Sequence, residues 1–176
     1  VAHGWHESNR EPEEVIALFH SEISEAFECF RNHEMELTIS EKGKPEGLPS
    51  EIADVAIRLL DIYGQYNVNP NPFCYDGSSK KYENRTISWW IYQFHDSLRT
   101  ALEDPVSDVT FHFHDLNNLF GLLFIFCDKF DIDLMKNINI IHYYSILVVS
   151  PSFPSNSLIG NKSSNDPFLI ANLPLK

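Results

Sequence analysis

The sequence predicts an all-α fold: a four-helix-bundle-like core built from a tandem pseudo-repeat of two-helix units, followed by an irregular C-terminal tail. Four segments carry apolar residues at i, i+3 and i+4 spacing, which is the period of an amphipathic helix. Stretches rich in Gly, Pro, Asn and Ser separate them. With 176 residues, 43% of them hydrophobic, the chain has the length and composition of one domain. We expect three parts, at residues 1–70, 71–135 and 136–176, of which the first two are halves of one bundle.

The apolar stripes place the four helices at about residues 12–30, 51–66, 86–103 and 114–130. Pro12, followed by two glutamates, is typical of a first helical turn, because the acids lie at the positive end of the helix dipole. Ser50 is expected to cap the second helix. No period is sustained after Met135, so we expect residues 136–176 to be irregular, with at most a short helix or strand at 140–149.

The bulk charge and the cysteines limit the function classes. A formal net charge of −12 and a pI near 4.9 argue against binding to nucleic acid or to an anionic membrane. No apolar run approaches the ~20 residues of a membrane span. The three cysteines, Cys29, Cys74 and Cys127, are dispersed, which fits a reducing compartment better than a disulfide framework. We therefore expect a cytoplasmic protein.

Two acidic pairs stand on the first two helices: Glu22 with Glu25, and Glu51 with Asp54. Residues three apart on a helix face the same way, so each pair can grip one hard cation. Oxygen-only ligands suit Mg²⁺, or Mn²⁺ as an alternative. A single E-x-x-E is more often a solvated helix face, and this sequence has three of them, whereas E-x-x-D occurs once. The conjunction of both pairs on adjoining helices predicts a four-carboxylate metal site.

The two halves of the chain align with each other. A shift of 75 positions pairs Phe19 with Phe94 and His20 with His95, and a shift of 64 positions pairs every apolar stripe position of the second helix with an apolar residue of the fourth. The four acids, in chain order, meet Ser97, Thr100, Asp115 and Asn118. One interpretation is a pseudo-dimer within one chain, with an active half and a scaffold half. The alternative is that any two amphipathic helices align this well.

The motifs around the acids resemble a known family. HSEISEAFECFR followed by KPEGLPSEIADVAIRLLD is similar to the MazG-like all-α nucleoside triphosphate pyrophosphohydrolases, which are related to the dimeric dUTPases, over residues 3–70. The resemblance implies that Glu22, Glu25, Glu51 and Asp54 bind Mg²⁺. It also implies that water attacks a nucleoside triphosphate to give the monophosphate and pyrophosphate. Glu22 or Glu25 is then the candidate catalytic base that orients this water.

Further substrate contacts follow from the same resemblance. Arg58 and Asp61 match the family's R-x-x-D, and Arg58, one turn from Asp54, is expected to brace a ligand rather than to touch substrate. Lys44 is a candidate phosphate contact on a loop. Trp5 is a candidate stacking partner for the base, or else an anchor of the N-terminal segment on the core.

One family motif is altered in this chain. Relatives follow the second helix with K-x-x-Y-N-x-x-R, and residues 80–85 here keep the residue types at a different spacing. Tyr82 and Asn84 are therefore candidate nucleotide contacts, and the base and sugar preference is not predicted.

Two alternatives remain open from the sequence, one for the oligomeric state and one for the activity. If the second half replaces a partner subunit, the chain works as a monomer, and a homodimer is the other arrangement. The rival to the enzyme is a non-catalytic helical interaction module derived from the same family.

Overall fold

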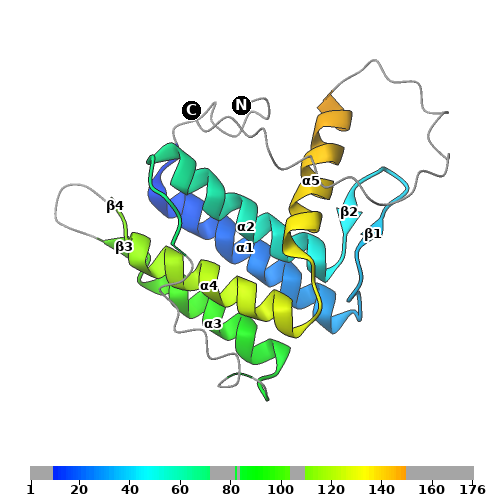
Figure 1. Cartoon of the computed structure of the whole chain (residues 1–176), viewed down its shortest axis with the longest axis horizontal. Coiled ribbons are helices and arrows are strands. Elements are labelled where there is room, and N and C mark those ends of the chain that lie inside the picture. The colour runs from blue at the N-terminus through cyan, green and yellow to red at the C-terminus, as the bar shows by residue number, and fades with distance from the viewer. Residues whose placement is uncertain (1–9, 72–81, 83, 104–109, 150–176) are drawn as a thin grey trace.

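The computed structural model describes residues 10–71, 82, 84–103 and 110–149, and it confirms the all-α fold (Figure 1). Five helices account for most of these residues, and the strands form two small hairpins of two residues a strand. In chain order the elements are α1 (Pro12–Arg31), β1 (Thr38–Ile39), β2 (Pro45–Glu46), α2 (Leu48–Gln65), α3 (Ile87–Arg99), β3 (Leu102–Glu103), β4 (Thr110–Phe111), α4 (Phe113–Lys129) and α5 (Leu134–Val149).

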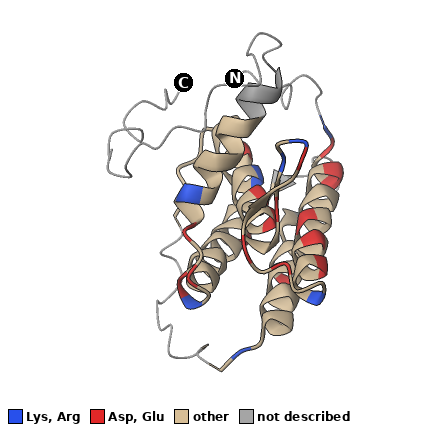
Figure 2. Ribbon diagram, turned by 90° about the vertical axis from the view of Figure 1, so that its right-hand side faces the viewer, with Lys and Arg blue, Asp and Glu red and all other residues tan. Residues whose placement is uncertain are grey.

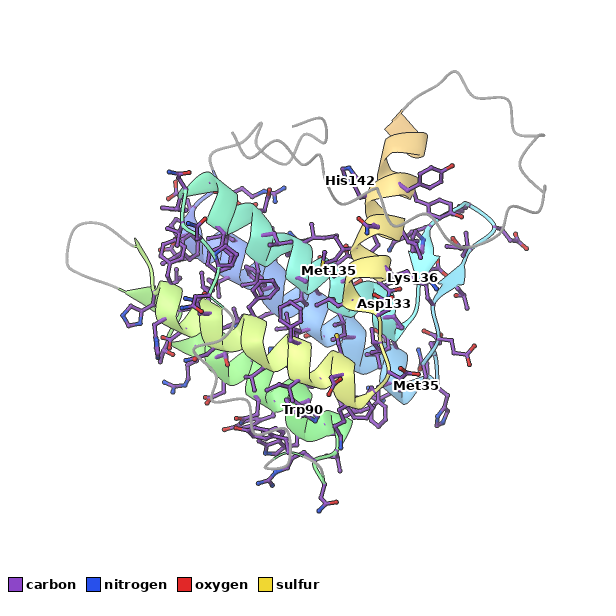
Figure 3. The ribbon with its side chains drawn as sticks, viewed as in Figure 1. Met35, Trp90, Asp133, Met135, Lys136 and His142 are labelled. Atoms are coloured by element: carbon purple, nitrogen blue, oxygen red, sulfur yellow. The ribbon has the colours of Figure 1, made fainter. Side chains whose placement is uncertain are left out.

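Helices α1 to α4 enclose the core. Helix α1 packs on α2 and α3, and α4 packs on α3 and α2, so the four apolar stripes meet in the middle of the bundle. The largest fully buried side chains include Trp90, Phe19, Phe94 and Phe126, and Trp90 marks the position of α3 in Figure 3. Each such side chain stabilises the fold by roughly 1.5–3 kcal/mol through removal of apolar surface from water. The core therefore holds the two acid-bearing helices in a fixed relation.

Both halves of the bundle have the same element order: a helix, a two-stranded antiparallel hairpin and a second helix. Two pairs of residues that the alignment matches are also buried to the same degree. Phe19 and Phe94 are both fully buried, as are Leu59 and Leu123. The hairpins were not predicted from sequence, because two-residue strands are too short to show a period of two. The matching order is what a tandem repeat predicts.

His20 and His95 meet across the contact between α1 and α3. Their Nδ1 atoms are 2.7 Å apart, and the two rings stack with centroids 5.0 Å apart. In a symmetric dimer a residue on the two-fold axis contacts its own copy. The alignment pairs His20 with His95, so a contact between them is what a pseudo-two-fold axis between α1 and α3 predicts. The duplication itself stays a prediction.

Helix α5 corrects the expected tail. The chain is helical from Leu134 to Val149. The prediction of an irregular segment is therefore wrong for residues 136–139, and the short helix or strand expected at 140–149 is the second part of this helix, while residues 150–176 lie outside the described part. Leu134 is buried and Ile138 packs on the core, but Met135 is largely exposed. Apolar residues on both the packed and the solvent side obscure the helical period, which explains the error. The helix packs on α2 and β2 and projects beyond the bundle (Figures 1 and 3).

The start of α2 also differs from the expectation. Gly47, rather than Ser50, occupies the N-cap position, and the hydroxyl of Ser50 donates to the carbonyl of Pro45 at 3.2 Å. Within the described residues, no helix combines the length and the apolar character needed to cross a membrane.

Gly47 fixes the junction between the β1–β2 hairpin and α2. Its φ is +102°, and a Cβ at this position would lie 2.2 Å from the carbonyl oxygen of Glu36. Gly47→Ala is therefore expected to lower the free energy of unfolding by roughly 3 kcal/mol, measured by urea denaturation. The matched control is Gly64→Ala inside α2, where a Cβ meets nothing within 4 Å, and there alanine is expected to stabilise by up to ~1 kcal/mol. Equal changes in the free energy of unfolding for the two variants would contradict the close approach of Gly47 to Glu36.

Candidate metal centre

The packing of α1 against α2 brings carboxylates from both helices together. Glu22 and Glu25 lie one turn apart on the flank of the α1 stripe, and Glu51 lies in the first turn of α2. Each offers one oxygen, and these oxygens all lie within 4.8 Å of one another. Oxygens that bind one cation at about 2.1–2.5 Å lie within about 5 Å of each other. The structure thus brings three of the four predicted metal ligands within reach of one ion.

Glu51 is the buried member of this cluster. Its side chain is only 6% exposed, and within the described residues it makes no hydrogen bond or ion pair. Burial, followed by the negative charges of Asp54 and Glu25, raises the pKa of Glu51 to about 7. A buried carboxylate without a partner is costly, because neither water nor a donor compensates its charge. A cation held by the three carboxylates would supply the positive charge that Glu51 lacks.

Asp54 lies one turn beyond Glu51 on α2 and is half-buried. It does not belong to the group of three within 4.8 Å, but burial and the charge of Glu22 raise its pKa to about 7. The sequence predicted Asp54 as a fourth ligand. The structure places it beside the cluster and couples it by charge to Glu22.

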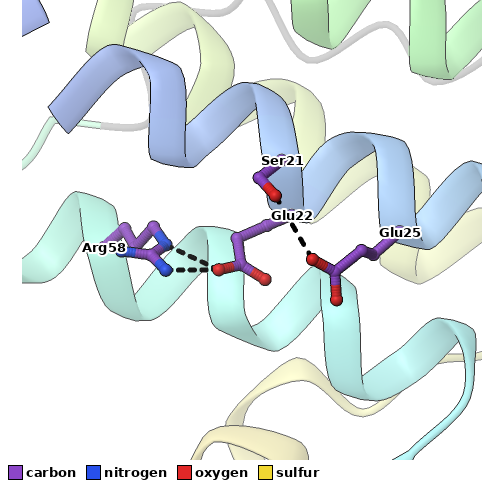
Figure 4. A network of polar contacts seen from close by, with 4 residues as sticks. All are labelled: Ser21, Glu22, Glu25 and Arg58. Atoms are coloured by element: carbon purple, nitrogen blue, oxygen red, sulfur yellow. Dashed lines mark hydrogen bonds and ion pairs between the residues drawn. The ribbon is translucent and has the colours of Figure 1, made fainter. Parts of the chain in front are cut away.

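Arg58 pairs with Glu22 across the two helices (Figure 4). Its Nε and one terminal nitrogen both donate to Oε1 of Glu22, with 2.9 Å from Nε. Both side chains are largely buried, at 14% and 13% exposed. Sequence reasoning placed Arg58 one turn from Asp54, but helical spacing alone does not show which neighbouring helix an arginine reaches. Its positive charge also lowers the pKa of Asp54.

Lys44 precedes β2 and is exposed. Its positive charge lowers the pKa of both Glu51 and Asp54, so the hairpin holds it near the second acidic pair. With all four acids ionised, Arg58 and Lys44 offset two of the four negative charges. The remaining charge of −2 matches one divalent cation.

Cys29 is a neighbour of the site that sequence reasoning did not assign to it. The thiol is buried one turn beyond Glu25, and burial together with the charge of Glu51 raises its pKa to about 11. It is therefore protonated at neutral pH. The available signal was its i+4 spacing from Glu25 in the same row of α1.

Three of the remaining sequence candidates, Asp61, Tyr82 and Asn84, do not belong to the cluster of three carboxylates. Asp61 is half-buried one turn beyond Arg58. Tyr82 is buried against Trp89 and Trp90 near the start of α3, and Asn84 is exposed just before that helix. Trp5 lies outside the described residues. Substrate contacts by these four residues stay predictions.

No family model, curated protein or solved structure matches this chain. The assignment of a function therefore rests on the geometry of the carboxylate cluster and on the motifs in the sequence.

Proposed function

We propose that this chain is a Mg²⁺-dependent nucleoside triphosphate pyrophosphohydrolase, which converts a (d)NTP to the monophosphate and pyrophosphate; Mn²⁺ is the alternative ion. The observation that carries the proposal is Glu51, which is buried without a partner among carboxylates from two helices. The reaction comes from the resemblance of the E-x-x-E and E-x-x-D helices to the MazG-like family. The all-α fold and the pairing of these helices support the same assignment.

The residues at the site fit a hard divalent cation. All the candidate ligands are carboxylates, whereas a zinc site typically recruits nitrogen or sulfur ligands. Two like charges 4 Å apart repel by about 1 kcal/mol in water and about 4 kcal/mol near a protein surface. Glu22, Glu25 and Glu51 would carry several such repulsions when all three are ionised, and the ion pair with Arg58 engages Glu22. A divalent ion removes this penalty and so stabilises the cluster.

In the proposed mechanism, some carboxylates of the site bind the ion and one acts as general base. Glu51 would hold the ion from α2 and Glu22, oriented by Arg58, would hold it from α1. Asp54, one turn from Glu51 on α2, would be the further ligand that the resemblance implies. When bound, the ion neutralises phosphate charge and lowers the pKa of a coordinated water. Glu25 is the better general base of the α1 pair, because Arg58 occupies Oε1 of Glu22 with two hydrogen bonds.

Glu25 is also exposed and therefore accessible to water. In the proposed step it accepts a proton from the attacking water, whose oxygen forms a bond to the α-phosphorus. The bond from that phosphorus to the bridging oxygen breaks, and pyrophosphate leaves with the electron pair.

The second half of the chain and the cysteines bear on the oligomeric state and on the cellular location. In this proposal the second half takes the place of a partner subunit, so one chain carries one site and works as a monomeric pseudo-dimer; a homodimer is the alternative assembly. Cys29 and Cys127 are buried free thiols, which fits a reducing, cytoplasmic location.

A nucleotide panel tests the proposal. The full chain is incubated with each common NTP and dNTP plus Mg²⁺, and the products are separated by ion-exchange chromatography. We expect monophosphate and pyrophosphate in equal amounts from at least one substrate, and no product with a chelator. Formation of a diphosphate and phosphate would contradict the assigned bond cleavage. Absence of any product, with no metal-dependent thermal shift, would favour the non-catalytic module.

A further inference from the structure

A pocket of about 340 Å³ lies where the segment before β1, the start of α2 and the turn between α4 and α5 meet. Ligand pockets in proteins typically have volumes of about 300 Å³ or more. Met35, Asp133 and Lys136 mark its position between α5 and the β1–β2 hairpin (Figure 3). Half of its lining residues are apolar: Met35, Leu37, Pro49, Phe130 and Ile132. The pocket can therefore bury the apolar part of a small molecule.

This pocket is separate from the carboxylate cluster of Glu22, Glu25 and Glu51. Its lining, drawn from the described residues, includes none of those acids. The α2 residue that lines it is Pro49, two positions before Glu51. Two positions turn an α-helix by about 200°, so Pro49 and Glu51 lie on opposite sides of α2. A ligand of this pocket is therefore a second ligand of the chain.

Asn137 offers the pocket an unused hydrogen-bond acceptor. It is only 6% exposed, and its Nδ2 donates to the backbone carbonyl of Asp133 at 2.8 Å. Its Oδ1 accepts no hydrogen bond within the described part of the chain. Among the described side chains, the Trp90 indole nitrogen is the sealed polar atom without a partner, so Oδ1 of Asn137 still reaches solvent. Such an oxygen in the wall of a pocket calls for a ligand that donates a hydrogen bond.

The charged residues of the pocket favour a cation. Glu36 and Asp131 are exposed, and their side chains make no hydrogen bond or ion pair within the described residues. Asp133 also lines the pocket, and its Oδ1 accepts from the amide of Lys136 at 2.9 Å. Three carboxylates against the one ammonium of Lys136 leave a formal charge of −2. Acids gather where α4 joins α5, as Figure 2 shows in red.

We propose that this pocket binds an organic amine, in which a protonated ammonium group is attached to an apolar chain or ring. An ammonium group has three N–H donors and no acceptor. It donates to Oδ1 of Asn137 and to the carboxylates of Glu36 and Asp131, while the apolar part packs on the apolar half of the wall. The inference does not rest on the proposed hydrolysis of nucleotides.

Three probes of similar shape and different charge test the class of ligand: 2-phenylethylamine, 2-phenylethanol and phenylacetate. Each is titrated into isotope-labelled full chain, and two-dimensional NMR spectra give both the affinity and the residues affected. We expect the amine to shift the backbone amides of residues 130–137 and the side-chain amide of Asn137. The alcohol lacks the charge and is expected to bind about 10-fold more weakly. Phenylacetate, which the acids repel, is expected not to bind.

Variants that remove one charge each test the two carboxylates. Asp131→Asn suits the turn, because the φ of Asp131 is +55°, a conformation that asparagine tolerates. Glu36→Gln changes only the end of an exposed side chain. Each change is expected to weaken amine binding about 3-fold, as for an exposed ion pair, and the double variant about 10-fold. The matched control is Asp128→Asn, an exposed acid of α4 outside the pocket, which is expected to bind like wild type.

Several outcomes would overturn the inference. Phenylacetate that binds as tightly as the amine would show a different ligand class, and equal losses for Asp128→Asn and Asp131→Asn would show a general effect of charge. Weaker amine binding in Lys136→Met would also contradict it, because loss of a nearby positive charge should leave the affinity for a cation equal or raise it.

Two further measurements separate the sources of the ammonium and the two sites. Nα-acetyl-lysine methylamide carries the ammonium of a protein side chain. If it binds more weakly than 2-phenylethylamine, the ligand is a free amine, and tighter binding would replace the free amine with a lysine of a partner protein. Glu51→Gln is expected to keep the wild-type affinity for 2-phenylethylamine, whether or not the chain hydrolyses nucleotides. A loss of amine binding in Glu51→Gln would place the amine at the carboxylate cluster and contradict the second site.

Discussion

Glu51→Gln is expected to abolish turnover and at the same time to stabilise the metal-free protein. Glutamine keeps the shape of the side chain but removes the negative charge that α1 and α2 bury together. Loss of a metal ligand is expected to lower kcat/KM by more than about 100-fold. At about pH 8 the ionised Glu51 costs the metal-free fold about 3 kcal/mol, the equivalent of its rise in pKa from 4.5 to about 7. The variant therefore melts several degrees higher than wild type without metal.

The control for this variant is Glu28→Gln, one turn beyond Glu25 on the exposed face of α1. It removes one acid from the same helix without touching the cluster, so turnover and melting temperature are expected to match wild type. Differential scanning calorimetry with and without Mg²⁺ gives the melting temperatures, and the nucleotide assay gives the turnover. A Glu51→Gln protein that melts lower than wild type without metal, or that keeps the full Mg²⁺ shift, would refute the role of Glu51.

Metal-free protein is expected to lose stability as the pH rises from about 4 to about 7. The folded-state pKa values of Glu51 and Asp54 are both about 7, above the ordinary 4.5 and 3.8. Across that window the native state binds more protons than the unfolded state, so the free energy of unfolding falls with rising pH. The stability contributed by the neutral carboxyls is complete below about pH 4 and is lost as the pH passes about 7.

Magnesium is expected to reverse this trend. The ion competes with protons for the same carboxylates, so its affinity rises as the pH increases through about 7. The melting temperature should therefore show little effect of Mg²⁺ at about pH 5 and a clear increase at about pH 8, measured by thermal denaturation at constant ionic strength. Ca²⁺ and Na⁺ at matched ionic strength separate binding from screening. An increase in melting temperature with Mg²⁺ that does not depend on pH would indicate that the ion binds away from Glu51 and Asp54.

The predictable part of the site came from helix periodicity. Spacing of three residues placed Glu22 with Glu25 and Glu51 with Asp54, and the apolar stripes showed that both helices pack in one core. These are local properties, which the order of residues in one helix determines. The alignment of the two halves paired Phe19 with Phe94, and both side chains are fully buried.

The rest depends on contacts between distant segments. The choice of Glu22 as the partner of Arg58, 36 positions apart, follows from the rotation of α2 against α1, which no single-helix pattern contains. The same rotation leaves Asp54 beside the closest group of three carboxylates. The sequence predicted no more than a short helix or strand at 140–149 in place of α5, because tertiary packing on α2 stabilises a sequence whose own period is weak. The N-cap at Gly47 depends on close approach to Glu36.

Anomalous diffraction from crystals soaked in Mn²⁺ tests the central claim most directly. The account predicts one strong peak per chain between α1 and α2, within about 2.2 Å of carboxylate oxygens of Glu51 and its α1 partners, and no such peak in Glu51→Gln crystals grown and soaked in the same way. A peak at another acidic group, or no peak at the cluster of Glu22, Glu25 and Glu51, would contradict it.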